Sequence, residues 1–442
     1  RMQGLLDLSH WIIFMLIVIS VFKNFFQWKI FLSFNLLVSV LVCCMGIIEY
    51  LGFSSILPNF ISKPGAGRVE STLGNSAYLG TYCLVNTFIA AALISLNAGK
   101  LLVRNSYQPK GSRNRPSRRR GVRRKDRNEQ LVRQKNLLTL ASTTFWTIAI
   151  FLNITVLSLT GTRGAMIGLG SSLIFASIVY SFSGKNLLVK KGSLFLIALA
   201  MLMVIAFFSY RDSEFVKSNI PSSSLAGRFV QLDINDASVV SRWHTWRAGL
   251  RAALDKPIFG WGPENFLIAW GRYFDEPDEI QERFDQAHNK IIEELTTKGI
   301  TGLLSYLSIW TLTAFYLVKV LKKGIATGFI VAISSALFAY FIQNLFLFDT
   351  LTTYSQFIIL ISLVVCMSQT SWTFDEQGNE IVKEKYCSKI KVWKNLKIAR
   401  LTTVYFCFAI VAPLMIVLIY WINIIRKRVF FALGGLQGNM RV

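Results

Sequence analysis

Three basic side chains are the strongest candidates for chemistry in this chain. His288 lies in the stretch FDQAHNKIIEELTTKGITGLL and is one of only three histidines. A neutral imidazole, with an ordinary pKa of about 6.5, is suited to taking or giving a proton at working pH. Arg163, in LSLTGTRGAMIGLG, and Arg242, in SRWHTWRAGLRAALDKPIFGWGPENF, carry guanidinium groups. Because guanidinium groups bind phosphate oxygens in a bidentate manner, these residues together could support transfer from a phosphate-activated donor.

Each of these side chains also has an ordinary explanation. A histidine close to a helix start, such as His288, often serves only as a hydrogen-bonded local cap. Arg163 lies in a short turn between two apolar stretches and could extend its guanidinium to lipid headgroups. Its neighbours Gly161 and Gly164, by contrast, would allow a ligand to approach the backbone closely. Both readings stay open for His288 and Arg163.

The stretch around Arg242 predicts an amphipathic helix that ends near Pro257. Helical spacing places Arg242 and Trp246 on one face, and an indole there also suits a membrane interface. Arg247 and Arg251 form a second strip on the same helix. That strip could be a solvated cationic face or part of a substrate site.

The chain offers no metal motif and no disulfide pattern. Glu293 and Glu294 follow His288, but no second histidine completes a metal-binding spacing. No CxxC pair and no nucleotide-binding loop is present. The six cysteines fall inside predicted spans or in a basic loop: Cys43, Cys44, Cys83, Cys366, Cys407 and Cys387. We therefore predict no metal site, no cofactor and no structural disulfide.

Membrane-spanning helices are the elements that must position these residues. The chain of 442 residues is 53% hydrophobic and only 16% charged, which is too little charge for the surface of an ordinary soluble protein. Apolar stretches long enough to cross the hydrocarbon recur along the chain, and barrel-type alternation does not. We predict an all-α, polytopic helical membrane protein with about ten spans, at roughly 9–22, 30–49, 76–97, 137–160, 164–183, 192–210, 302–320, 324–347, 355–370 and 401–424.

Positive charge predicts the orientation of the spans. Segment 99–135 is the densest run of charge in a chain of net charge +24, and positive loops mark the cytoplasmic side. The lysine-bearing short loops and segment 371–400 fall on that same side. The arginines of 99–135 lack the interleaved aromatics of a base-stacking platform, so they indicate contact with anionic lipid headgroups and not with nucleic acid.

The predicted organisation has four parts. Residues 1–210 form N-terminal transmembrane helices, and residues 211–301 form a large, partly helical extracytoplasmic loop domain that carries the candidate catalytic residues Arg242 and His288. That segment is too long for a simple connection and holds most of the acidic residues and two histidines. Residues 302–424 form the C-terminal transmembrane helices, followed by an extracytoplasmic tail at 425–442. Because the chain opens with Arg1 and not with Met, we expect a fragment whose beginning lies upstream. The tail stops abruptly after the last span, so we expect it to be truncated.

Four stretches, taken in order, resemble a known family. In them the chain resembles the O-antigen ligase and polymerase superfamily of bacterial envelope glycosyltransferases. The resemblance covers nearly the whole chain, although the basic run at 99–135 departs from the family's compact pattern. The four stretches, of which the last two are the most specific, are GRVESTLGNSAYLG (67–80), TGTRGA (160–165), RWHTWRAGLRAALDKPIFGWGPENF (242–266) and FDQAHNKIIEELTTKGITGLLSYL (284–307).

The resemblance implies an inverting, metal-independent glycosyltransferase of the bacterial cytoplasmic (inner) membrane, with its active site on the extracytoplasmic face. Its donor would be a glycan linked to undecaprenyl pyrophosphate. His288 matches the loop histidine proposed to activate the acceptor hydroxyl, and Arg163 and Arg242 match arginines thought to hold the pyrophosphate. Asp285 could orient the imidazole. The predicted substrate-binding residues are Arg68, Asp285, Asn289 and Arg247.

Three functions remain open at this level. A ligase would deliver a finished glycan to another sugar, to lipid A-core or to a protein hydroxyl, whereas a polymerase would join repeat units. Both use the same donor chemistry, so these residues do not distinguish them. A non-catalytic transporter of lipid-linked saccharide would use the same arginines but would not need a histidine on the outer face. The internal repeats common in transporters are not detectable in the sequence.

Overall fold

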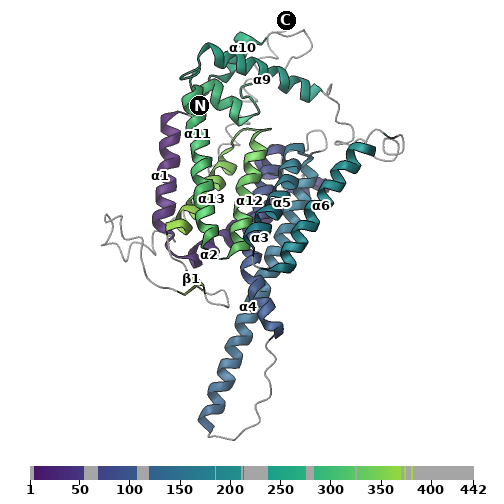
Figure 1. Ribbon diagram of the computed structural model, residues 1–442, viewed down its shortest axis with the longest axis vertical. Helices are drawn as coiled ribbons and strands as arrows, with labels where there is room; N and C mark the ends of the chain where they lie inside the picture. Colours follow the sequence, from purple (N-terminus) through teal and green to yellow (C-terminus); the bar gives the residue numbers. More distant parts are fainter. Residues whose placement is uncertain are drawn as a thin grey trace. The chain divides into compact units, whose positions relative to one another are not determined.

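Figure 1 shows the computed structural model of the chain, which is built from helices. The structure describes residues 4–53, 68–106, 119–184, 186–210, 213, 237–274, 283–323, 326–369, 373–374 and 380–381. All of them belong to one compact unit, Arg1–Glu384.

The predicted all-α fold class is confirmed. A short 3-10 turn, Ser71–Leu73, precedes α3, and the two described strands are the antiparallel pair β1 (Thr373–Phe374) and β2 (Glu380–Ile381). The helices are α1 (Leu5–Val21), α2 (Phe25–Tyr50), α3 (Ser76–Ser106), α4 (Arg119–Thr160), α5 (Arg163–Ser183), α6 (Leu187–Tyr210), α9 (Ala237–Asp255), α10 (Phe266–Tyr273), α11 (Lys290–Lys322), α12 (Thr327–Asn344) and α13 (Leu351–Gln369).

Seven helices of the described residues are long and apolar enough to cross a membrane. They are Phe25–Tyr50, Ser76–Asn97, Asn136–Thr160, Arg163–Ser183, Lys290–Lys322, Thr327–Asn344 and Leu351–Gln369. Each coincides with a predicted span. The predicted spans at 9–22 and 192–210 coincide with the apolar helices α1 and α6, and the one at 401–424 lies outside the described residues.

The basic segment at 99–135 is more helical than the predicted loop. Helix α3 continues to Ser106, and α4 already begins at Arg119. The physical reason is that arginine, lysine, glutamine and glutamate are good helix formers, so a charged run can extend a transmembrane helix into water. Residues 107–118 lie outside the described part of the chain.

Helices α3, α5 and α12 pack together in the middle of the bundle, as Figure 1 shows. Small residues allow this close approach. A Cβ added at Gly168 of α5 would lie 2.9 Å from a methyl group of Leu84 in α3 and 3.2 Å from the carbonyl oxygen of Ala339 in α12. Because helices in lipid associate through close van der Waals packing, small residues are expected at such crossings.

Helices α9, α10 and the start of α11 share an apolar cluster of their own. Ala248, Phe266, Trp270, Ala287 and Ile292 form its buried part. This cluster positions the segment that the sequence predicted as a partly helical loop domain. Its chemistry therefore rests on a packed support and not on an isolated loop.

A kink at Gly299 divides α11, and the turn after α9 supplies hydrogen bonds to the backbone groups around the kink. Gly299 has φ 67° and ψ −166°, so it interrupts the helix. The carbonyls of Thr296 and Thr297 accept hydrogen bonds from the backbone N–H groups of Trp261 and Gly262, at 3.0 and 2.8 Å. The Ile300 N–H in turn donates to the Pro257 carbonyl at 2.8 Å. Since broken helices at membrane depth need replacement hydrogen bonds, these bonds stabilise the kink. They also fasten the end of α9 to α11.

Candidate active site

His288 lies two residues before the start of α11, in a backbone conformation that few residues other than glycine adopt. Its φ is 48°, in the left-handed region. Bonds to the preceding residue hold it there. The Trp246 indole N–H donates to the Ala287 carbonyl at 2.8 Å, and the Ala287 N–H donates to the Glu293 carboxylate at 2.7 Å. Strained backbone that is fixed by its surroundings is typical of functional sites.

Asn289, and not His288, caps α11. The Asn289 side-chain oxygen accepts hydrogen bonds from the backbone N–H groups of Ile291 and Ile292, at 3.0 and 3.2 Å. Two of the N–H groups left unsatisfied at the helix start are thereby paired. The ordinary explanation of His288 as a local cap is therefore wrong.

The imidazole of His288 lies in an aromatic environment. Its ring centroid is 5.7 Å from that of Phe284 and 5.2 Å from that of Phe348, both in edge-on geometry. Burial, together with the charge of Arg242, lowers the pKa of His288 to about 4, against a smaller opposing effect of Asp285. Because the pKa is lowered, the ring is neutral at every pH well above 4.

Arg163 is the first residue of α5, after the tight turn that the sequence predicted between two spans. The Thr162 hydroxyl anchors this turn by donating to the Ser76 carbonyl at 3.1 Å. A Cβ added at Gly164 would lie 2.6 Å from the Gln343 side-chain oxygen and 3.0 Å from Cβ of Phe346. The arginine turn thus packs against the end of α12 and the residues that follow it.

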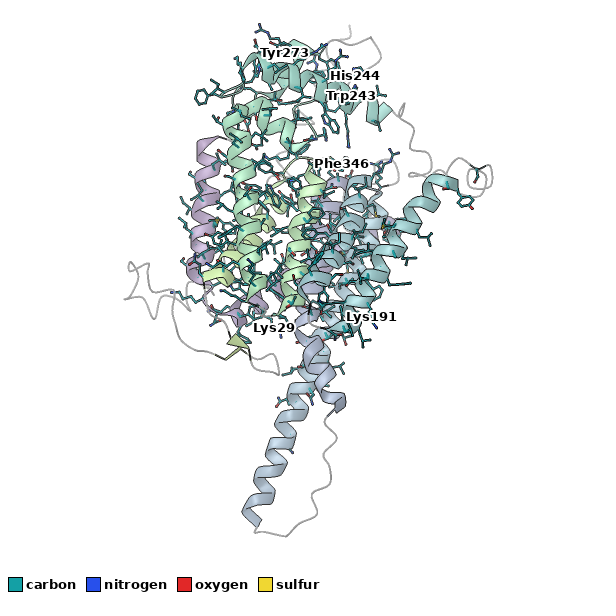
Figure 2. All side chains as sticks on the ribbon, in the orientation of Figure 1. Lys29, Lys191, Trp243, His244, Tyr273 and Phe346 are labelled. Carbon is teal, nitrogen blue, oxygen red and sulfur yellow. The ribbon has the colours of Figure 1, made fainter. Side chains whose placement is uncertain are left out.

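The connection between α12 and α13 joins the arginine turn to the histidine. Phe346 faces Gly164, and Phe348, two residues later, contacts His288 as well as Tyr78 of α3, at 5.8 Å between ring centroids. Figure 2 labels Phe346 at the end of the bundle that lies nearest to α9. Elements far apart in the sequence therefore meet around this connection.

Several buried polar atoms have no hydrogen-bond partner among the described residues. In this region they include the side-chain oxygens of Gln286 and Gln343 and Nδ1 of His288. A buried polar group without a partner costs free energy, and such groups are expected where a polar ligand binds. Sequence reasoning did not single out either glutamine.

A buried charge network holds the α12–α13 connection onto α11. Lys290 forms ion pairs with Asp349 at 2.7 Å and with Glu294 at 2.9 Å. Asp349 also accepts hydrogen bonds from the Tyr340 hydroxyl and, at 2.7 Å, from Asn344. Burial alone would raise the pKa of Asp349, but Lys290 and these hydrogen bonds lower it below its ordinary value, so it stays charged. Sequence analysis missed this network, although the spacing of Lys290 and Glu294 by four residues was a readable signal.

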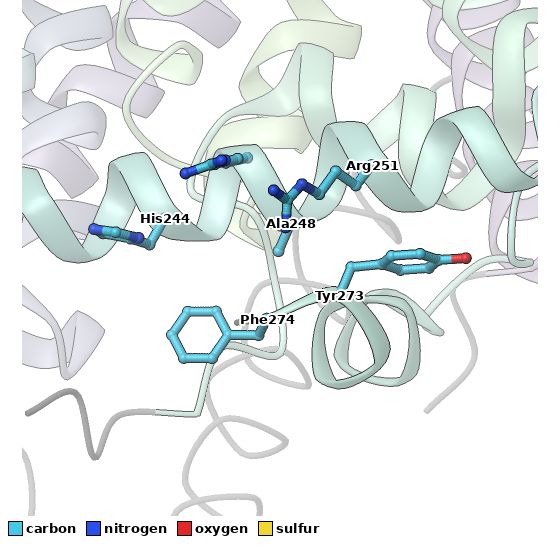
Figure 3. A pocket seen from close by; sticks show the side chains of 6 residues that line it. His244, Ala248, Arg251, Tyr273 and Phe274 are labelled. Atoms are coloured by element: carbon cyan, nitrogen blue, oxygen red, sulfur yellow. The ribbon is translucent and has the colours of Figure 1, made fainter. Parts of the chain in front are cut away.

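Arg247 lines a separate pocket, on the side of α9 away from Trp246. Figure 3 shows this pocket between α9 and the end of α10. It has a volume of about 200 Å³, less than the roughly 300 Å³ at which pockets for drug-sized ligands begin. The lining residues are His244, Arg247, Ala248, Arg251, Tyr273 and Phe274. The spacing of His244 from Arg247 and Arg251 could have revealed it from the sequence.

Comparison with known proteins now identifies the central part of the chain. Residues 148–307 match the family model described as O-Antigen ligase. This segment is similar to O-antigen ligases. The match confirms the resemblance to the O-antigen ligase and polymerase superfamily over three of the four stretches, and the stretch at 67–80 lies outside it. The apolar helices together with the family support a bacterial membrane protein. The matched segment contains Arg163, Arg242 and His288, whereas Asp349 and Phe348 lie beyond it.

A relative gives a weaker similarity. An uncharacterized protein of Haemophilus influenzae is 25% identical over 182 residues, which cover 40% of this chain and 44% of that protein. The aligned region thus spans less than half the length of the relative.

The remaining predicted residues take different positions. Asp285 is close enough to His288 to influence its pKa, and Arg68 is exposed next to the buried Val69. Substrate contacts of Arg68, Asp285, Asn289 and Arg247 stay predictions. Among the described residues, no group of three or more histidine, cysteine, aspartate or glutamate side chains is arranged to hold a metal ion.

Proposed function

We propose that this chain is a membrane glycosyltransferase of the O-antigen ligase type. It would transfer a glycan from undecaprenyl pyrophosphate to a hydroxyl of a sugar, lipid A-core or protein acceptor, at the extracytoplasmic face of the cytoplasmic membrane. One observation carries the proposal. The buried, neutral imidazole of His288 lies within the electrostatic reach of Arg242, and both lie in the segment that matches the O-antigen ligase family.

In the proposed reaction, the acceptor hydroxyl oxygen attacks the anomeric carbon of the donor's first sugar. The bond between that carbon and the pyrophosphate oxygen breaks, undecaprenyl pyrophosphate departs, and the configuration inverts. The hydroxyl proton passes to His288, which can accept it because its ring is neutral. A single displacement of this kind balances atoms and charge without a metal or a further reactant.

The charge of Arg242 has a second consequence for this reaction. A base with a pKa of about 4 is weak, because its protonated form is disfavoured by burial and by the nearby guanidinium. A pyrophosphate bound at Arg242 would offset that positive charge and raise the pKa of His288. His288 would thus become a stronger base only when the glycan donor is bound.

Arg163 and Arg242 would stabilise the charge that develops on the departing pyrophosphate. A hydrogen-bond donor that points at the developing charge lowers the activation free energy by about 2.7 to 4 kcal/mol. Replacing either arginine with alanine should therefore reduce turnover by about a hundredfold or more. Arg163→Lys and Arg242→Lys should recover only part of the loss, since lysine keeps the charge but not the bidentate geometry.

The test uses the purified chain in lipid vesicles with a labelled undecaprenyl-pyrophosphate glycan and candidate acceptors. His288→Ala should abolish product formation while donor binding persists. His10→Ala is the matched control, since His10 is exposed on α1, and it should retain full activity. If His288→Ala keeps wild-type turnover, the assignment of the base is wrong.

The same assay separates the other functions. Transfer to a distinct acceptor indicates a ligase, and lengthening of the lipid-linked glycan indicates a polymerase. Donor binding and translocation without any product in the wild type would indicate a transporter and refute the proposed enzyme.

A further inference from the structure

Helix α9 exposes a stripe of large apolar side chains. Trp243, Leu250 and Leu254 are all exposed, with Leu254 at 80%. Spacings of seven and four residues place them on one face of a helix. Ile258 and Phe259, in the turn after α9, are exposed as well, with Phe259 at 77%. Such a contiguous apolar surface marks an interaction site.

This surface continues the outer side of α11. The Thr301 hydroxyl and the Ile300 N–H donate to the carbonyls of Ile258 and Pro257, so the turn after α9 lies directly beside residues 300 and 301. From there the candidate span exposes further apolar side chains. They include Ile300, Leu304, Leu307, Leu312, Phe315 and Val318.

The length of α11 indicates how deep the turn after α9 lies relative to the membrane. With a rise of about 1.5 Å per residue, the helix from Ile300 to Lys319 is about 30 Å long. That is about the thickness of the hydrocarbon core of a bilayer. Ile258 and Phe259 therefore lie at the height where the hydrocarbon of one leaflet ends, if α11 crosses the membrane upright.

Basic side chains border the stripe. Arg247 and Arg251 follow it along the neighbouring face of α9 and line the pocket of Figure 3 together with His244. A helix with tryptophan and leucine on one face and arginines beside them has the composition of an interfacial helix that binds anionic lipid. The pocket, at about 200 Å³, has room for a small anionic group such as a lipid phosphate.

We propose that α9 is a membrane-surface helix, whose apolar stripe enters the leaflet beside α11 and whose Arg247 and Arg251 bind lipid phosphate groups. This docking would fix the helix while its other face keeps Trp246 bonded to Ala287, next to His288. The inference does not depend on the proposed reaction, because it concerns the support of the site and not its chemistry.

Photo-crosslinking in vesicles tests the docking. The photoreactive residue p-benzoylphenylalanine would replace Leu254 or Phe259, with labelled phosphatidylcholine and phosphatidylglycerol in the membrane. Phe315, exposed on the span, is the positive control. Gly271 of α10 is the negative control, because a side chain added there meets no atom within 4 Å and α10 lies on the side of α9 away from the bundle (Figure 1).

Lipid adducts should form at Leu254 and Phe259 in yields close to that at Phe315 and well above that at Gly271. If Leu254 and Phe259 label no better than Gly271 while Phe315 labels fully, α9 does not lie on the membrane. The result would then favour water or a protein partner on this face.

A second arm tests the arginines. Each arginine near an anionic surface contributes an attraction equivalent to about fivefold in partitioning. The adduct yield at Leu254 should rise when phosphatidylglycerol is added to phosphatidylcholine, and Arg247→Gln/Arg251→Gln should remove that rise. The reporter at Phe315 in the same double variant checks that the chain still inserts. An equal rise with and without the arginines would overturn their role, and a rise abolished by millimolar inorganic phosphate would indicate a site for a soluble anion instead.

Discussion

The lowered pKa of His288 gives the sharpest test of the site, and Arg242→Gln is the informative change. An imidazole with the ordinary pKa of about 6.5 is about nine-tenths protonated at pH 5.5, whereas one with a pKa of about 4 is almost entirely neutral there. The difference corresponds to about 3 kcal/mol between the two protonation states. Burial is the larger cause and Arg242 the second. Arg242→Gln should therefore raise the pKa part of the way from 4 toward 6.5.

Histidine NMR can measure this directly, because the chain has only three histidines. Ring-labelled protein in lipid nanodiscs would be titrated from pH 3.5 to 8, with His288→Gln used to assign the signal. Adding inorganic pyrophosphate should raise the wild-type pKa, since a bound anion offsets the charge of Arg242, and should have little effect on the Arg242→Gln variant. The same shift predicts that folding stability falls as the pH drops from 6.5 toward 4, because the unfolded chain binds the proton more tightly.

Two results would refute this reasoning. A wild-type His288 that titrates near 6.5 would mean that water reaches the ring, contrary to its packing against Phe284 and Phe348. An unchanged pKa in Arg242→Gln would mean that the guanidinium does not act on the imidazole, and the assignment of Arg242 to the donor's pyrophosphate would lose its main support.

Three further changes test the surroundings of the site. Lys290→Met should destabilise the protein by about 3 to 5 kcal/mol, because it leaves Asp349 buried without its ion pair. Lys290→Met/Asp349→Leu should restore much of that stability. Equal unfolding midpoints for the single and the double variant would contradict this role of the ion pair. Asn289→Ala should lower the free energy of unfolding by about 1 kcal/mol, because the helix cap is lost. Asn289→Ser should keep both stability and turnover. A loss of turnover in Asn289→Ser would instead indicate a substrate contact. Gly164→Ala should lower the free energy of unfolding by about 1 to 3 kcal/mol and lower turnover, because its Cβ would press on Gln343 and on the connection after α12. Gly170→Ala is the matched control, because the space around its Cβ is open. It should change neither stability nor turnover.

The sequence predicted the helices well because their determinants are local. Hydrocarbon thickness requires about 20 apolar residues per span, so a window of sequence contains the whole signal. The turn at Arg163 and the helix that ends before Pro257 are also local, since proline breaks a helix and glycine favours the turn that follows one. The pattern from Ile291 through Gly299 into a span was readable for the same reason, and the structure has it as one kinked helix.

The charged segment at 99–135 shows where a local signal misleads. Its composition predicted a loop, because it is too polar to cross a membrane. Charge excludes burial in lipid but does not exclude helix, and the described ends of the segment continue α3 and α4.

Tertiary structure alone decided which residues meet. Asp349 and Phe348 follow a different span from the one that follows His288, and nothing in their local sequence indicates that they face Lys290 and the imidazole. The pKa of His288 is equally non-local, because it depends on burial by Phe348 and on a charge one helix away. Sequence by itself determined that this chain spans membranes with helices and carries a histidine among arginines. Only the packing of α9, α11 and the α12–α13 connection made that histidine a neutral, buried group beside Arg242, because proximity across a fold is a property of the packed chain and not of any segment of it.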